Sequence, residues 1–102
     1  MYIAMNRFKA NTPRAAEFEQ VWRERNSQLA QVPGFVSFKL LRGSDQEGVT
    51  LYVSHSTWAS EQAFVDWTES EAFRAAHGGA RTPQDVLLGP PQFEGFEVVL
   101  ES

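Results

Sequence analysis

A histidine followed by two glycines, His77-Gly78-Gly79, ends a stretch whose pattern predicts a short helix. A histidine at the end of a helix can be a simple polar terminus, because its protonated form complements the negative end of the helix dipole. It can also transfer protons or bind a metal. The two glycines have no Cβ and would allow a large planar group to approach the backbone closely. Position alone leaves these three roles open.

The numbers of histidine and cysteine residues limit the kind of metal centre in which His77 could be a ligand. Zinc sites use three or four protein ligands, and the chain has two histidines and no cysteine. Haem iron needs only one protein ligand besides the four nitrogens of the porphyrin. If His77 binds a metal, haem is therefore the economical candidate. The other histidine, His55, lies in a predicted strand and is interpreted as a structural or dimer-facing residue.

Three further residues could contribute to such a site. Asn6 lies inside a predicted strand, where asparagine is disfavoured. Its amide could bond a neighbouring loop, or it could donate a hydrogen bond to a bound oxygen species or a polar substrate. Trp67, ten positions before His77, could be a core residue or the wall of a pocket. Arg25 could extend its charged end to water or pair with a carboxylate such as a haem propionate.

Other chemistries find little support in the sequence. The net charge of −4 argues against a nucleic-acid surface, which needs clustered Lys and Arg, and against an anionic membrane. The absence of cysteine excludes disulfides, iron–sulfur clusters and a cysteine nucleophile. There is no G-x-S-x-G, no Gly-rich phosphate loop and no H-E-x-x-H motif. Because no signal-peptide pattern or long apolar stretch is present, we expect a cytoplasmic protein.

The elements that must position these residues follow from the hydrophobic periodicity. Thr12 is the expected N-cap of the first helix, with Pro13 in its first turn, and Ser60 and Ser70 are the expected caps of two later helical segments. A glycine-containing loop at residues 43–48 is predicted to join two strands into a hairpin. The pattern predicts strands at residues 2–9, 35–41, 49–58 and 93–100, and helices at residues 14–31, after Ser60 and at 71–77, with a loop at 80–91.

This order, β-α-β-β-α-β, is that of the ferredoxin-like fold of the α+β class. The 102 residues contain no linker or repeat, so a single domain, residues 1–102, is expected. Helices on one face of the sheet would leave its other face uncovered, yet apolar residues occur on both alternations of the strands. We therefore expect a homodimer in which two sheets close into an α/β barrel.

Three segments of the chain carry a resemblance to a known family. They are Met5-Asn6-Arg7-Phe8, the W-x-S-x-x-A-F-x-x-W stretch from Trp58 to Trp67, and Phe73-Arg74-Ala75-Ala76-His77. Together they resemble the IsdG-type haem-degrading monooxygenases of the antibiotic biosynthesis monooxygenase (ABM) superfamily, which are dimeric α/β barrels. The tryptophan stretch indicates the ABM fold in general. The combination of Asn6, Trp67 and His77 is more specific, because it matches the active-site set of the haem-degrading branch.

The resemblance implies a role for each of these residues. His77 would be the proximal iron ligand, and Asn6 the distal hydrogen-bond donor to iron-bound dioxygen or hydroperoxide. Trp67 would press on the porphyrin and hold it in a ruffled shape, and Arg25 would pair with a propionate. The implied reaction consumes haem, O2 and reducing electrons and gives an opened tetrapyrrole and free iron. The loop at residues 78–91 follows the ligand and could cover the pocket.

Two other functions stay open at this point. One is a cofactor-independent ABM monooxygenase acting on a quinol or polyaromatic substrate, in which Asn6 and Trp67 would position the substrate and dioxygen. The other is a non-catalytic haem-binding or sensing barrel, which would return haem unchanged. The run His77-Gly78-Gly79 favours haem degradation over the first alternative, but the sequence does not separate it from the second.

Overall fold

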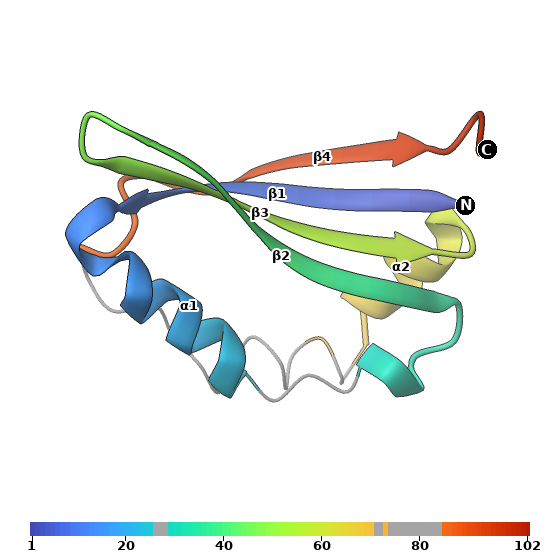
Figure 1. Ribbon diagram of the computed structural model, residues 1–102. Coiled ribbons are helices and arrows are strands. Elements are labelled where there is room, and N and C mark those ends of the chain that lie inside the picture. Colours follow the sequence, from blue (N-terminus) through green and yellow to red (C-terminus); the bar gives the residue numbers. More distant parts are fainter. Residues whose placement is uncertain (26–28, 71–72, 74–84) are drawn as a thin grey trace.

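The computed structural model describes residues 1–25, 29–70, 73 and 85–102. It shows a four-stranded antiparallel sheet with both α-helices packed below the same face (Figure 1). The strands are β1 (Tyr2–Asn11), β2 (Phe35–Gln46), β3 (Val49–Trp58) and β4 (Gln92–Glu97), in the spatial order β2-β3-β1-β4. The helices are α1 (Ala15–Glu24) and α2 (Glu61–Thr68), with 3₁₀ turns η1 (Thr12–Arg14) and η2 (Leu29–Gln31). The predicted ferredoxin-like α+β arrangement is confirmed.

The hairpin between β2 and β3 is tighter than the sequence pattern predicted. Residues 43–46 belong to β2, where Asp45 pairs with Thr50 and Gln46 with Val49. Only Glu47 and Gly48 form the turn, and both have positive φ, 54° and 83°. Two successive residues of this kind match the right-handed twist of the strands that they join. The predicted loop over residues 43–48 is therefore wrong, because a two-residue turn suffices.

Two predictions about the first helix are also wrong. Thr12 does not cap it: the Thr12 hydroxyl is hydrogen-bonded to the hydroxyl of Thr50 at 2.9 Å, and an α-helix begins only at Ala15. The helix ends at Glu24 instead of residue 31, because Arg25 has an extended backbone with ψ 122°. Asparagine and serine, which are poor helix formers, follow Arg25 in the sequence. An apolar stripe shows which face of a helix is buried but not where the helix ends.

The side chains of both predicted serine caps accept a backbone hydrogen bond, as a cap requires. The Ser60 side chain accepts a hydrogen bond from the backbone N–H of Ala63 at 3.1 Å and caps α2 as expected. The Ser70 hydroxyl accepts one from the N–H of Phe73 at 3.2 Å. The rest of the helix predicted over residues 71–77, including His77, lies outside the described residues. The last strand ends at Glu97, earlier than predicted.

Two hydrophobic clusters hold the helices to the sheet. One, under α1, consists of Ala10, Phe18, Tyr52 and Val86. The other, beside α2, is centred on Trp58, which is fully buried. The Trp58 ring lies 5.3–5.7 Å from the rings of Phe35, Phe64 and Trp67. In the part of the chain that the structure describes, no helix is long and apolar enough to cross a membrane.

Gly34, between η2 and β2, offers a test of how closely α2 packs on this end of the sheet. Its φ is +84°, and a Cβ added there would lie 2.4 Å from the Cβ of Ala63. We expect Gly34→Ala to lower the free energy of unfolding by about 2–4 kcal/mol, the sum of left-handed strain and overpacking. Chemical denaturation monitored by tryptophan fluorescence measures this loss.

Gly48→Ala is the matched control, because Gly48 has nearly the same φ, +83°, with no atom within 4 Å of the added Cβ. It should cost only the backbone strain, about 1–2 kcal/mol. Equal losses in the two variants would show that the contact with Ala63 contributes nothing.

Candidate active site

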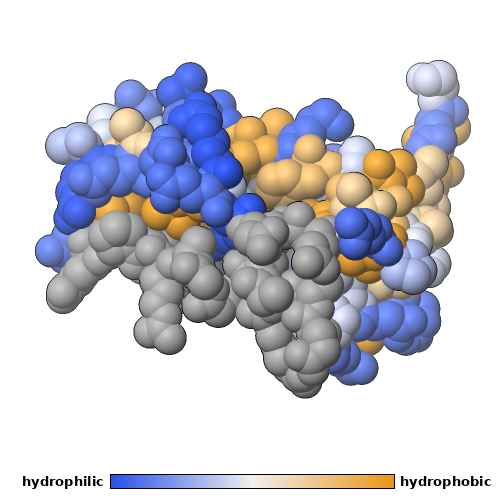
Figure 2. Space-filling model, turned by 90° about the horizontal axis from the view of Figure 1, so that it is seen from below, coloured by the Kyte–Doolittle hydropathy of each residue, from blue (hydrophilic) through white to orange (hydrophobic). Residues whose placement is uncertain are grey.

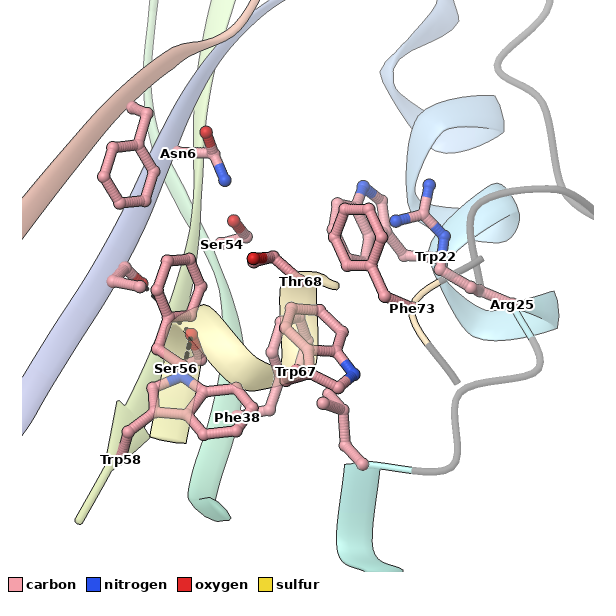
Figure 3. Close-up of a pocket in the computed structure, with 14 residues that line it drawn as sticks. Asn6, Trp22, Arg25, Phe38, Ser54, Ser56, Trp58, Trp67, Thr68 and Phe73 are labelled. Carbon is pink, nitrogen blue, oxygen red and sulfur yellow. Dashed lines mark hydrogen bonds between the residues drawn. The ribbon is translucent and has the colours of Figure 1, made fainter. Parts of the chain in front are cut away.

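A cavity of about 380 Å³ lies between the sheet and the helices (Figure 3). It lies between the two hydrophobic clusters, where β1 and β3 carry small side chains instead of large ones. Ala4 and Asn6 on β1 and Ser54 and Ser56 on β3 leave this space unfilled. The remaining lining residues are mostly aromatic or apolar: Trp22, Arg25, Leu29, Phe38, Trp58, Phe64, Trp67, Thr68, Phe73 and Phe93. The cavity is therefore suited to a large, mainly apolar ligand.

Asn6 lies on the sheet wall of this cavity, with its amide directed into the open space (Figure 3). Its side chain makes no hydrogen bond to any residue that the structure describes, so its amide remains free to bind a ligand. The alternative that Asn6 bonds a neighbouring loop finds no support among these residues.

Trp67 combines the two roles considered for it. Its indole packs against Trp58 at 5.3 Å and against Phe73 at 4.9 Å and 83°, and it also lines the cavity. Aromatic rings on both sides restrict the movement of the indole. Trp67 is thus both a core residue and a rigid wall of the pocket.

Arg25 and Trp22 form the part of the cavity wall that belongs to the end of α1. The Arg25 guanidinium carbon lies 4.0 Å from the centre of the Trp22 ring, a cation–π contact. Arg25 Nε and Trp22 Nε1 are buried and have no hydrogen-bond partner among the residues that the structure describes. Burial lowers the pKa of Arg25 from its usual value, although a guanidinium stays protonated in the neutral range. Two buried donors without partners mark this wall as a place for an acceptor carried by a ligand.

Sequence patterns do not identify Trp22 as a site residue, because its helical spacing indicates only that it lies on the buried face of the first helix. Its ring is stacked on Phe38 of β2 at 5.5 Å and 22°, a contact that depends on how the helix docks. No local sequence pattern indicates that the Trp22 indole N–H lacks a hydrogen-bond partner among the described residues.

A polar network at Glu19 helps to set the position of this wall. The Tyr52 hydroxyl donates to Glu19, whose carboxylate also pairs with Arg23 at 3.2 Å and Arg42 at 3.0 Å. Burial and the bond to Glu19 raise the pKa of Tyr52 to about 12. The same hydrogen bond, with the nearby arginines, lowers the pKa of Glu19. The contacts of Glu19 with Arg42 and Tyr52 tie α1 to β2 and β3 one turn before Trp22, whereas the pair with Arg23 lies within the helix.

The structure describes only one of the two histidines. His77 lies outside the described residues. His55 is on the face of the sheet opposite the cavity, with Met5 and Lys39 as its cross-strand neighbours. Its Nδ1 is buried and has no partner in the described part of the chain. His55 therefore does not contribute to the cavity, in agreement with its interpretation from the sequence. Among the described residues, no group of three His, Cys, Asp or Glu side chains could hold a metal ion.

Comparison with known proteins identifies relatives of this chain. A heme oxygenase described as mycobilin-producing, from Mycobacterium tuberculosis, is 33% identical over 99 residues, which cover 97% of this chain and 90% of the relative. The solved structure of the heme degrader MhuD from the same organism, with two hemes bound in its active site, has a TM-score of 0.77 and 30% identity. That alignment covers 100% of this chain and 99% of MhuD.

A structure of SnoaB, a cofactor-independent oxygenase from Streptomyces nogalater, is also similar, with a TM-score of 0.70 and 25% identity. It covers 98% of this chain and 94% of that chain. Residues 1–79 match the family model described as antibiotic biosynthesis monooxygenase. The chain therefore belongs to the antibiotic biosynthesis monooxygenase family.

Proposed function

We propose that this protein is a haem-degrading monooxygenase, which opens the porphyrin ring with O2 and reducing electrons and releases iron. The observation that carries the proposal is the distribution of donors in the cavity. Aromatic walls enclose a space with a free amide on the sheet side. At the end of α1, the buried donors of Trp22 and Arg25 have no partner among the described residues. Haem combines a flat apolar ring with two carboxylates and matches this distribution. The 33% identity to a heme oxygenase supports the same conclusion.

Each candidate residue has a role in this reaction. Bound haem would supply both the iron at which O2 is activated and the ring that is opened. Asn6 would orient the oxygen ligand through its amide, and Trp67 would press on the ring as a rigid wall. His77 would bind the iron. Phe73 supports this role, because it lines the cavity and residues four apart share one face of a helix, so the predicted helix would turn His77 toward the same space.

A haemin titration of the purified protein tests the function. We expect a saturable Soret band that bleaches to a tetrapyrrole spectrum when ascorbate is added in air. A stable Soret band with ascorbate and with a protein electron donor would identify a haem carrier or sensor instead. No band at stoichiometric haemin would favour the cofactor-independent alternative, for which the similarity to SnoaB is the specific support. Turnover of quinols without haem would then be measured.

We propose that Arg25 and Trp22 bind a haem propionate. Because a hydrogen bond from a charged donor to a carboxylate contributes roughly 1.5–3 kcal/mol, Arg25→Ala should weaken haemin binding about tenfold or more. Haemin dimethyl ester, which has no free carboxylate, should bind the variant and the unmodified protein almost equally. Soret titrations with both ligands measure the difference.

Arg23→Ala is the control for this prediction. Arg23 is a neighbouring exposed arginine that pairs with Glu19 and does not line the cavity. It should change the binding of neither ligand. If Arg25→Ala weakened the ester as much as haemin, its effect would come from packing and not from the propionate.

We infer further that the protein is a homodimer of single-domain subunits that acts in the cytoplasm. The dimer is supported by the face of the sheet opposite the helices, which no described element covers (Figure 1). The strand alternation puts Ile3, Met5, Leu51, Val53 and Phe96 on this face. Phe96 is exposed, and apolar surface of this kind is typical of an interface. Two such sheets packed together would form the expected barrel.

A further inference from the structure

The sheet wall of the cavity carries a second polar side chain, Ser54, that no part of the proposed mechanism uses. Ser54 lies directly opposite Asn6 in the pairing of β1 with β3. Side chains opposite each other on one face of an antiparallel pair have Cβ atoms about 4.5–5.5 Å apart. Figure 3 shows Asn6 and Ser54 directed into the same part of the cavity. Their polar groups can therefore reach a common ligand atom.

The other hydroxyls that line the cavity, on the sheet and on α2, already make hydrogen bonds within the protein. Ser56 accepts a hydrogen bond from Trp58 Nε1 at 2.9 Å and donates to the carbonyl of Ala4 at 3.3 Å. The Thr68 hydroxyl donates to the carbonyl of Val65 at 2.7 Å. Among the described residues that line this part of the cavity, Ser54 is thus the hydroxyl whose proton is not committed.

Ser54 is only 7% exposed, and its hydroxyl has no hydrogen-bond partner in the part of the chain that the structure describes. The residue lines the cavity, so a bound ligand can accept the proton of its hydroxyl. Figure 2 shows hydrophobic residues gathered on the half of the helix side toward the C-terminal end of β4. The cavity lining is also mostly apolar, so a ligand there would present few polar atoms.

We propose that Ser54 is a second hydrogen-bond donor, beside Asn6, to the small polar ligand that would bind at the sheet wall of the cavity during haem degradation. Ser54 is then a catalytic residue, because its hydroxyl contacts the ligand at which the reaction begins. The inference rests on the proposed haem-degrading function and adds to it a two-donor site for a diatomic or small anionic ligand.

The test compares Ser54→Thr with Ser54→Val in the haemin-loaded protein. Threonine and valine have nearly the same shape and both suit a strand, so the two variants differ in the hydroxyl alone. The probe is azide, an anion whose binding to the ferric complex is measured by absorbance. A lost hydrogen bond to an anion corresponds to an affinity about tenfold lower. We expect this loss in Ser54→Val and nearly unchanged affinity in Ser54→Thr.

Equal azide affinity in the two variants, with haemin bound normally, would overturn the role of Ser54 and leave the proposed function intact. If the unmodified protein binds no haemin, the proposed function fails and this inference fails with it. Should the added methyl group of either variant prevent folding, Ser54→Ala replaces the pair. It must then show the same loss of azide affinity relative to the unmodified protein for the proposal to stand.

Discussion

Asn6→Ala will leave haem bound but lower the rate of its degradation by about a hundredfold or more. The amide is directed into the cavity (Figure 3) and has no partner among the described residues, so the variant removes a donor without exposing a new unpaired group. Removing one preorganised donor from a reacting centre typically costs 10²–10³ in rate. Haem affinity should hardly change, because the apolar walls and the donors of Trp22 and Arg25 remain. Soret titration and single-turnover bleaching under ascorbate separate the two quantities.

Asn11→Ala is the control for this variant. Asn11 is the last residue of the same strand, and its amide donates to the carbonyl of Asp85 at 3.3 Å, outside the cavity. Its replacement should leave the rate of haem degradation unchanged. An undiminished rate in Asn6→Ala would remove Asn6 from the mechanism.

His77→Ala should weaken haemin binding by about a hundredfold or more. Loss of a group that only supports a metal ligand already costs 10–100-fold in affinity, and His77 is proposed as the ligand itself. The variant should remain folded, since a histidine at a helix terminus contributes little to packing. Equilibrium titration, with circular dichroism as a check on folding, measures both effects. Added imidazole should restore the Soret band by replacing the missing ligand.

His55→Ala distinguishes the two histidines. His55 lies on the opposite face of the sheet from the cavity, so its removal should leave haem affinity intact. The reverse result, with normal binding by His77→Ala and weak binding by His55→Ala, would assign the iron to His55. It would also move the site to the uncovered face of the sheet.

Several features could be predicted from the sequence because they depend on local chemistry. Strand alternation and helical periodicity gave the element order, and the cap at Ser60 followed from a serine placed before an apolar turn. Asn6 was singled out because an asparagine inside an apolar strand needs a partner. The structure brings Asn6, Arg25 and Trp67 to one cavity, and their roles toward haem stay predictions. His77 stays a prediction.

The two errors about the first helix have physical causes that local sequence patterns do not report. The end of α1 at Glu24 depends on Arg25 leaving the helix and stacking on Trp22, and periodicity alone extends the stripe further. Thr12 was assigned as a cap from its neighbour Pro13, but a hydroxyl of the adjacent strand, on Thr50, competes for its side chain. For Thr12 a tertiary contact is preferred to a local one, and for α1 the backbone leaves the helix at Arg25 although the apolar stripe continues.

By itself, the sequence determined the ferredoxin-like order of this protein, because that order follows from periods along the chain. Residue type and position singled out Asn6 and Arg25, whereas Trp67 was assigned to the site through the family resemblance. Only the tertiary structure decided that the cavity exists and which donors in it are free. Pairing of β1 with β3 sets Asn6 opposite Ser54. Docking of α1 leaves Trp22 Nε1 buried, with no partner among the residues that the structure describes. Both depend on register and packing between segments far apart in the sequence, about which local patterns carry no information.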